Sequence, residues 1–279
     1  MHRDPSVEAL GYFYSVRFAD EANKYLANPV KRALQILRFD SIDSTNLEAM
    51  RQAKAGAPEG LCVIAREQTR GRGRLDRSWH SPTDAGLYLS VILRPRFPIT
   101  SWPLIGLAAA LAVHDAVLTT CNLKVDIKWP NDLCFNDQKL CGILSETVET
   151  EEGSAAIVGM GVNLTDDGFP PELKLQATSL HAATGTYADR DLLVNELLKA
   201  LTRRYETLQR DGGGEQIIRD WCENSSYAFG RHVRVAVGTD SFVGVTRGLE
   251  RDGALRVEAE TIRIVRAGDV TALRAHAGD

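Results

Sequence analysis

Two short motifs combine side chains that bind anions with glycines that let a ligand come close to the backbone. The first is GRGR at residues 71–74, whose guanidinium groups match phosphate and carboxylate oxygens in pairs. The second is KWPND at residues 128–132, which is followed by Lys139 and Gly142. Together the two motifs predict a site where a carboxylate is activated with a nucleotide.

The GRGR motif follows a predicted strand. Residues 61–65 are continuously apolar, so residues 68–77 are expected to form a loop at a strand end, where ligands commonly bind in mixed α/β domains. A solvated basic loop or a nucleic-acid contact of the Gly-Arg-rich kind would explain the same residues, because short Arg-Gly runs are common. Trp79 adds a stacking or packing surface, and the motif alone leaves these alternatives open.

The second motif ends one strand and leads into a hairpin. Pro130 restricts the residue before it to an extended conformation and predicts a tight turn immediately after it. Residues 133–146 are typical of a β-hairpin with its turn at 136–138. Lys139 is then either an edge charge or a cation held over a ligand. Gly142 favours the ligand, because glycine inside a strand often marks a close approach.

A third segment lies upstream of both motifs. Residues 34–39 suggest a strand, and residues 44–55 suggest a helix that Gly56 ends. Thr45 and Glu48 match a capping box, so Thr45 could satisfy backbone amides at the helix start, contact a ligand, or do both.

These segments resemble the biotin protein ligase family, whose members attach biotin to a lysine of carboxylase carrier domains. The motifs that carry the resemblance are STN at 44–46, Gln68, GRGR at 71–74 with Arg77 and Trp79, KWPND at 128–132, KLCGIL at 139–144 and GMGVN at 159–163. They occur in the family's order from about residue 34 to the end. Chance recurrence of five ordered motifs is far less probable than recurrence of one.

The resemblance implies a fold and a domain plan. The fold is α+β, with a mixed sheet and flanking helices like those of class II aminoacyl-tRNA synthetases and biotin ligases, plus a small SH3-like β-barrel at the C-terminus. We expect a catalytic domain at 34–226 and a C-terminal domain at 227–279, in which strands are predicted at 233–237, 242–245, 254–257 and 262–265.

The resemblance also implies a reaction that uses ATP, Mg²⁺ and biotin. The biotin carboxylate attacks the α-phosphate of ATP, pyrophosphate leaves, and the lysine of a biotin carboxyl carrier protein domain then takes the acyl group. Because two anions must meet, Arg72, Arg74 and Lys139 would neutralise them, while Mg²⁺ bridges nucleotide oxygens. Lys139 and Arg72 are the candidate catalytic cations, and Asp132 would orient and deprotonate the acceptor lysine.

Two sets of ligand contacts follow from the resemblance. The expected biotin contacts are Ser44, Thr45, Asn46, Gln68, Gly71, Arg72, Gly73, Arg74, Lys139 and Gly142. The expected ATP contacts are Arg72, Arg74, Arg77, Trp79, Lys128, Asn131, Lys139, Asn163 and Arg247. An exposed strand arginine would equally explain Arg247, and no residue is assigned to a protein-bound metal.

The sequence departs from the family pattern at two positions. Asp76 stands where the arginine loop usually has glycine; Asp tolerates left-handed geometry, but its carboxylate could pair with Arg77 and weaken retention of the adenylate. Ala177 lies close to a position that can carry an aromatic residue for adenine stacking, so the base would rest on aliphatic side chains.

Composition agrees with a soluble cytoplasmic enzyme. The formal net charge of -4 gives no global basic field, and five cysteines without a Cys-x-x-Cys pair argue against a disulfide framework or a zinc site. The apolar stretch at 104–113 is too short to span a bilayer. Residues 1–33 carry no secretory signal and are too few for a three-helix DNA-binding unit, so we expect a short packed or frayed extension and no DNA binding.

Three alternatives remain at this point. Lipoate ligase shares the expected fold and chemistry, although the KWPND and GRGR motifs favour biotin. A biotin sensor or DNA-binding regulator would keep the pocket without the enzymatic activity. A plain α/β domain would require all the motif matches to be accidental. Family members pair through sheet edges, but no residue pattern here settles whether the chain forms a homodimer.

Overall fold

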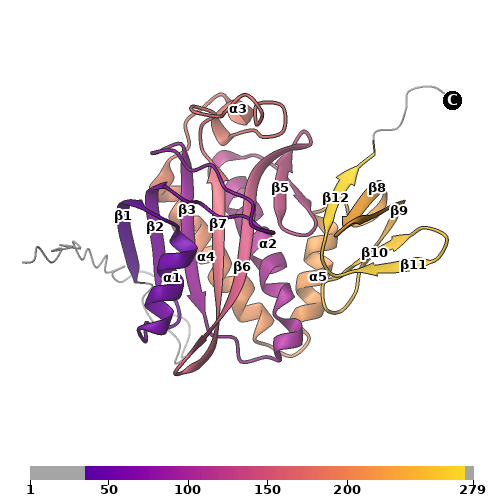
Figure 1. The fold of residues 1–279 in the computed structure, drawn as a ribbon, viewed down its shortest axis with the longest axis horizontal. Helices are drawn as coiled ribbons and strands as arrows, with labels where there is room; N and C mark the ends of the chain where they lie inside the picture. The colour runs from indigo at the N-terminus through magenta and orange to yellow at the C-terminus, as the bar shows by residue number, and fades with distance from the viewer. Residues whose placement is uncertain (1–34, 274–279) are drawn as a thin grey trace, which may run out of the picture.

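The computed structural model describes residues 35–273, and these residues form two sheets with helices around the larger one (Figure 1). The extension expected at 1–33, and with it the expectation about DNA binding, lies outside the described residues. The α+β architecture agrees with the fold implied by the motifs.

The larger sheet has seven strands in the order β1-β2-β3-β7-β6-β5-β4. Its strands are β1 (Ile36–Ile42), β2 (Cys62–Gln68), β3 (Gly86–Leu93), β4 (Asp126–Lys128), β5 (Asp132–Phe135), β6 (Gln138–Thr150) and β7 (Gly153–Asn163). Only β1 and β2 are parallel, which makes the sheet mixed. The predicted hairpin is confirmed, with Asn136 and Asp137 at positive φ in its turn.

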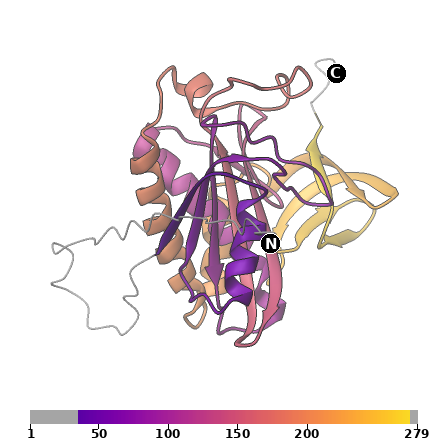
Figure 2. The ribbon, with the colours of Figure 1, turned by 60° about the vertical axis from the view of Figure 1, so that its left-hand side comes forward.

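Helices cover both faces of this sheet. The described helices are α1 (Thr45–Lys54), η1 (Ile99–Ser101), α2 (Pro103–Cys121), α3 (Leu180–Thr184), α4 (Arg190–Leu208) and α5 (Gly213–Glu223). Helix α1 packs on one face, and α2 packs on the other with α4 and α5 behind it (Figures 1 and 2). Apolar side chains of β3 and β7 alternate between two cores, one on each face.

Helix α2 is the central element of the larger core. The segment Ile99–Cys121 is apolar and long enough to cross a membrane, yet 67% of its most apolar window is buried inside the protein. Leu107, Leu111 and Val117 are each less than 5% exposed. The prediction of a buried helix at this position is therefore confirmed.

The smaller, C-terminal sheet has five antiparallel strands in the order β11-β10-β9-β8-β12. Its strands are β8 (Phe229–Val237), β9 (Asp240–Leu249), β10 (Leu255–Glu258), β11 (Ile262–Val265) and β12 (Asp269–Ala272). Only four of these strands were predicted, because β12 is short and has one buried apolar side chain, Val270. The indole N–H of Trp129 donates to the Gly253 carbonyl oxygen at 3.0 Å and joins the larger sheet to the smaller one.

Candidate functional site

The predicted motifs meet around one cavity of about 130 Å³ on the α1 face of the larger sheet. It lies near the sheet end where β1, β2 and β7 finish and where β3 and β6 begin. Residues from every predicted motif line it: Ser44, Thr45, Asn46, Gln68, Arg72, Gly73, Arg74, Arg77, Trp79, Asn131, Asp132, Lys139, Gly142, Gly159, Met160 and Gly161. Chain segments far apart in sequence thus form a single site.

The floor of the cavity is a set of uncharged hydrogen-bonding side chains, which we define as Thr45, Asn46, Gln68 and Ser90; Gln68 is partly buried, and the buried Ser90 supports the lining residues from beneath. The Ser90 hydroxyl donates to Asn46 Oδ1 at 2.6 Å and lies 2.7 Å from Thr45 Oγ1. The backbone N–H and hydroxyl of Thr45 both donate to Gln68 Oε1, at 2.8 and 3.1 Å. These contacts fix donors and acceptors in place before any ligand arrives.

The capping box proposed for Thr45 and Glu48 is wrong. The N-cap of α1 is Ser44, which makes no side-chain cap hydrogen bond, and Glu48 instead accepts from Arg51 and Gln52. The capping box does not form because Gln68 Oε1, from β2, accepts the hydrogen bond from the Thr45 N–H that Glu48 would accept in a capping box. The Thr45 side chain consequently faces the cavity.

The arginine loop folds back on itself as a narrow turn. The Gly73 N–H donates to the Arg77 carbonyl oxygen at 2.7 Å, and the Trp79 N–H donates to the Gly71 carbonyl oxygen at 2.8 Å. Asp76 sits at φ 57°, which confirms that an aspartate tolerates left-handed geometry at the usual glycine position. It does not pair with Arg77, which contacts Asp269 instead.

We define the rim of the cavity as Arg72, Arg74, Arg77 and Lys139. Three of these cations have a carboxylate partner. Lys139 Nζ lies 2.7 Å from Asp132 Oδ1, Arg72 Nη1 lies 3.1 Å from Glu146 Oε1, and Arg77 pairs with Asp269. Arg74 instead donates to Asn131 Oδ1 at 3.1 Å and to the Gly268 carbonyl oxygen.

The environment shifts the pKa of several rim groups. The hydrogen bond from Arg77 lowers the pKa of Asp269, and the same bond raises the pKa of Arg77. Burial lowers the pKa of Arg74, because desolvation disfavours the charged form. Arg74 thus carries a partly desolvated charge without a direct carboxylate partner, so an anion that enters the cavity would be attracted to it.

Glycines on β6 and β7 leave space for the Trp79 ring, which forms one wall of the cavity. A Cβ atom on Gly142 would lie 2.9 Å from the Trp79 ring, and one on Gly161 would lie 2.6 Å from Trp79 Nε1. Lys139 Nζ lies 5.3 Å from the centroid of the Trp79 ring. The close approach at Gly142 is made by the side chains of Trp79 and Lys139, and contact of Gly142 with a ligand stays a prediction.

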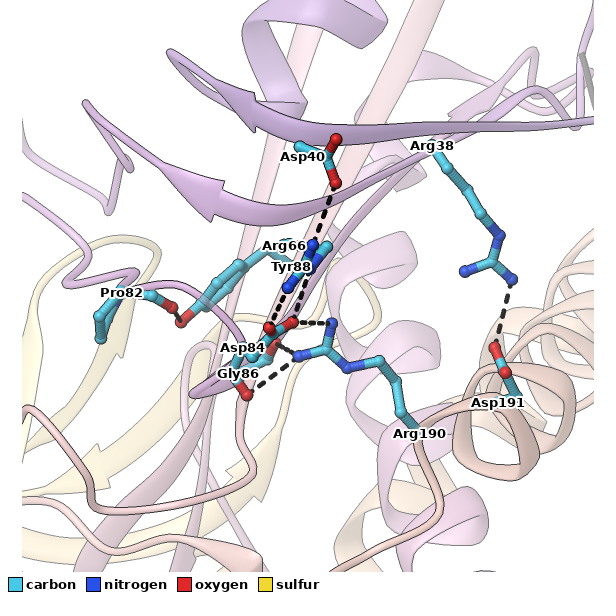
Figure 3. A network of polar contacts seen from close by, with 9 residues as sticks. All are labelled: Arg38, Asp40, Arg66, Pro82, Asp84, Gly86, Tyr88, Arg190 and Asp191. Carbon is cyan, nitrogen blue, oxygen red and sulfur yellow. Dashed lines mark hydrogen bonds and ion pairs between the residues drawn. The ribbon is translucent and has the colours of Figure 1, made fainter. Parts of the chain in front are cut away.

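A second polar network holds the start of β3, which carries Tyr88 into the cavity lining (Figure 3). Asp84 accepts from Arg66 and Arg190, and Arg190 also donates to the Gly86 carbonyl oxygen at 2.9 Å. The Tyr88 hydroxyl donates to the Pro82 carbonyl oxygen at 2.9 Å. Helix α4 is thereby tied to the strand that supports the floor.

Four residues of the predicted site do not line the cavity. Gly71 lies behind it, where a Cβ atom would come within 2.4 Å of the Trp79 carbonyl oxygen. Asn163 is buried and donates to the Thr178 carbonyl oxygen, and Lys128 lies over the Tyr227 ring. Arg247 forms an ion pair with Glu258 at 2.5 Å, as an exposed strand arginine does.

Sequence reasoning missed four residues of the site. Glu146 and Asp269 supply carboxylates to the rim, and Ser90 and Tyr88 belong to the floor region. The nearly continuous apolar run of β3 signals a buried strand, which makes a serine such as Ser90 unusual there. No local pattern signals Glu146 or Asp269.

Comparison with known proteins agrees with this geometry. The model of the biotin/lipoate A/B protein ligase family matches residues 36–163, and that of the biotin protein ligase C terminal domain matches 228–271. A bifunctional ligase/repressor BirA from Bacillus spizizenii is 36% identical over 235 residues, which are 83% of this chain and 72% of that protein. The chain belongs to the biotin protein ligase family.

Further relatives include a biotin--[acetyl-CoA-carboxylase] ligase from Mycobacterium tuberculosis. It is 34% identical over 239 residues, which are 83% of this chain and 86% of that protein. A solved biotin protein ligase from Aquifex aeolicus, in complex with biotin and ATP, superposes with a TM-score of 0.74 at 28% identity and covers 86% of this chain and 99% of its own. The fold class implied by the motifs is thereby confirmed.

Proposed function

We propose that this chain activates biotin with ATP to form biotinyl-5'-AMP and then transfers the biotinyl group to a lysine of a carboxylase subunit. The observation that carries the proposal is the single cavity in which an uncharged floor meets a cationic rim. A neutral hydrogen-bonding floor suits the ureido ring of biotin, and a cationic rim suits a carboxylate and phosphates.

Each part of the cavity has a separate task in this proposal. Thr45, Asn46 and Gln68 would bind biotin with donors and acceptors that are already oriented. Lys139 and the arginines of the rim would lower the repulsion between the carboxylate and the α-phosphate, so that the two reacting groups can align. Positioning and charge neutralisation would supply most of the rate enhancement, because this type of transfer needs little covalent help.

Asp132 would serve the second step. Its carboxylate lies against Lys139 Nζ at 2.7 Å and lines the same cavity, so it is available to an acceptor lysine that enters there. A lysine must lose a proton to become a nucleophile, and a carboxylate in hydrogen-bonding range can orient the amine and accept that proton. Attack on the adenylate carbonyl then breaks the bond to phosphate and releases AMP.

Mg²⁺ fits this site as a companion of the nucleotide. Among residues 35–273, no cluster of three or more His, Cys, Asp or Glu side chains forms a metal cage. Mg²⁺ usually keeps several waters and binds substrate phosphates with one or two carboxylates. Asp132 and Asp269 are the carboxylates that line the cavity; Asp269 is paired with Arg77, so Asp132 is the one that would contact the ion. When bound, the ion would neutralise phosphate charge.

The acceptor and the assembly are further parts of the proposal. We propose that the acceptor is a biotin carboxyl carrier protein domain, that the enzyme acts in the cytoplasm, and that it forms a homodimer through a sheet edge. Strands β1 and β4 are the edges of the larger sheet. All five cysteines are free thiols, as is usual in a reducing compartment. Residues 34–226 would form the catalytic domain, and 227–279 would supply Asp269.

Exchange of labelled pyrophosphate into ATP tests the activation step without the acceptor. We expect exchange that requires biotin and Mg²⁺ and that lipoate does not support. Exchange with lipoate alone would move the substrate assignment to the lipoate branch of the family. No exchange with either acid, from a folded protein, would contradict the proposed function and favour a protein that only binds biotin.

A further inference from the structure

One charged side chain connects the rim of the cavity to its floor. Glu146 lies on β6 with its side chain 20% exposed. One carboxylate oxygen lies 3.1 Å from Arg72 Nη1, and the other accepts from Asn46 Nδ2 at 2.9 Å. In the described part of the chain, no other carboxylate contacts both a rim cation and a floor residue.

Asn46 is a fixed anchor for this carboxylate. Its Nδ2 also lies 3.2 Å from the Leu144 carbonyl oxygen, and its Oδ1 accepts from the Ser90 hydroxyl. The side chain fills the space above Gly159, where a Cβ atom would lie 2.1 Å from Asn46 Oδ1. Asn46 is 3% exposed, so it has no room to follow a moving partner.

Arg72, in contrast, has a long side chain with many rotamers, although hydrogen bonds hold the backbone on either side of it. It lies between Gly71 and Gly73, and its side chain is 36% exposed. A free arginine side chain loses considerable rotamer entropy when it binds a ligand, and a partner that restrains it beforehand reduces that loss. Glu146 engages one edge of the guanidinium group and leaves other N–H donors available to the cavity.

We infer that Glu146 is a positioning residue that holds Arg72 in the orientation in which it receives the biotin carboxylate. The inference rests on the proposed function and adds a residue to it. Because Glu146 is anchored to Asn46, it directs Arg72 toward the floor, where biotin would bind. Asp269, which pairs with Arg77, belongs to the C-terminal sheet and has no such anchor on the floor.

Two substitutions weaken the contacts of Glu146 to different degrees. In Glu146→Gln, the carbonyl oxygen can still accept from Arg72 and Asn46, as Oε2 does here at 3.4 and 2.9 Å, but the negative charge and the second oxygen on Arg72 are lost. In Glu146→Ala, both contacts are lost. We expect the Kd for biotin, measured by calorimetry, to rise about fivefold in the Gln variant and about twentyfold in the Ala variant. The KM for ATP should change less than about twofold.

Glu149→Gln is the matched control. Glu149 lies on the same strand, is exposed, and contacts Ser154 rather than the cavity. The Glu149→Gln substitution removes the same charge away from the cavity, so the Kd of this variant for biotin should equal that of the wild type. A double-mutant cycle with Arg72→Ala provides the decisive comparison. If Glu146 acts through Arg72, then Glu146→Gln should have almost no further effect on biotin binding in the Arg72→Ala background.

Two results would overturn the inference. A Kd for biotin within about twofold of the wild type in both Glu146 variants would show that Arg72 needs no restraint. Equal effects of Glu146→Gln with and without Arg72 would assign Glu146 a purely structural role through Asn46. If the wild-type chain itself neither bound biotin nor exchanged pyrophosphate, the proposed function would fail first, and this inference with it.

Discussion

The floor and the rim of the cavity hold their polar groups in opposite ways. Ser90 and Asn46, on the floor, are almost fully buried, and apart from the contact of Asn46 with Glu146 they bond to uncharged groups. Arg77 and Lys139, on the rim, remain 62% and 35% exposed and pair with carboxylates. The floor thus offers fixed geometry at the cost of adaptability, whereas the rim offers charge that can exchange partners when ligand anions arrive.

We infer from this difference that the floor selects the ligand and that the rim promotes the reaction. A buried neutral network rejects ligands that leave its donors or acceptors unpaired, because each unpaired group costs about 1–3 kcal/mol. Exposed ion pairs are worth about 0–1 kcal/mol, so substrate anions can replace them readily. Changes in the rim should therefore alter turnover and the binding of anionic groups, and changes in the floor should reduce both biotin affinity and stability.

The largest effect is expected at Lys139. Lys139→Ala removes the cation nearest to Asp132 and the Trp79 ring, and we expect biotin-dependent pyrophosphate exchange to fall by about 10²- to 10³-fold. The unfolding free energy should change little, because the side chain is partly exposed. Lys199→Ala, on α4, is a surface control. A loss below tenfold at Lys139 would remove it from the catalytic centre.

A smaller effect, on both affinity and stability, is expected at the floor. Ser90→Ala leaves Asn46 Oδ1 without its 2.6 Å donor, so the free energy of unfolding should fall by about 1–3 kcal/mol in urea titrations. The Kd for biotin should rise in parallel. Ser154→Ala, at an exposed position that contacts Glu149, should change neither quantity. Unchanged stability and affinity in Ser90→Ala would contradict a preorganised floor.

The next effect concerns the carboxylate that reaches the rim from the smaller sheet. Asp269→Asn removes the negative partner of Arg77, which then becomes free to bind phosphate. We expect the KM for ATP to fall about two- to fivefold, with a steeper dependence on salt because the arginine charge is no longer compensated. A higher KM would indicate that Asp269 helps to bind the nucleotide, through Mg²⁺ or by orienting Arg77.

The smallest effect is a pH dependence next to the floor. The hydrogen bond from Arg51 lowers the pKa of Asp43 from 3.8 to about 2, and the Asp43 carboxylate also accepts from the Ser44 N–H at 2.7 Å. A depressed pKa in the folded state stabilises the protein above the pKa of the unfolded state, near 4, and this stabilisation is lost as pH falls toward 2.

Asp43→Asn should reveal this contribution. Because Arg51 is half exposed, solvent screens its ion pair with Asp43, and we expect the pair to stabilise the folded state by about 1 kcal/mol. The difference in unfolding free energy between wild type and variant should be about 1 kcal/mol at pH 7 and should shrink as pH is lowered below 4. A constant difference across this range would assign the effect to the hydrogen bond geometry rather than to the charge.

The sequence predicts residues of this site best where local rules and function coincide. Gly142, the arginine loop and the hairpin before Lys139 each follow from local rules of backbone geometry and strand pairing, whereas Gly161 was expected only from the family resemblance. Glu146 and Asp269 could not be predicted in this way, because their partners lie 74 and 192 residues away in the chain. Long-range ion pairs leave no periodic trace in a sequence.

The failed capping box illustrates the same limit. Thr45 and Glu48 have the right spacing, but Gln68 supplies the acceptor from another strand, and tertiary contact overrides the local preference. Strand β12 was missed for a related reason. Its four residues begin with Asp269, a residue type that is depleted in strands, and they are ordered by pairing with β8.

Direct detection of the intermediate tests the central claim, that one cavity activates biotin and then transfers it. The purified chain is mixed with biotin, ATP and Mg²⁺, quenched, and analysed by mass spectrometry before and after addition of a carrier domain. We predict close to one equivalent of biotinyl-5'-AMP per chain, which disappears as the carrier lysine gains biotin. Hydrolysis of ATP without this intermediate, or an intermediate that the carrier does not consume, would contradict the account.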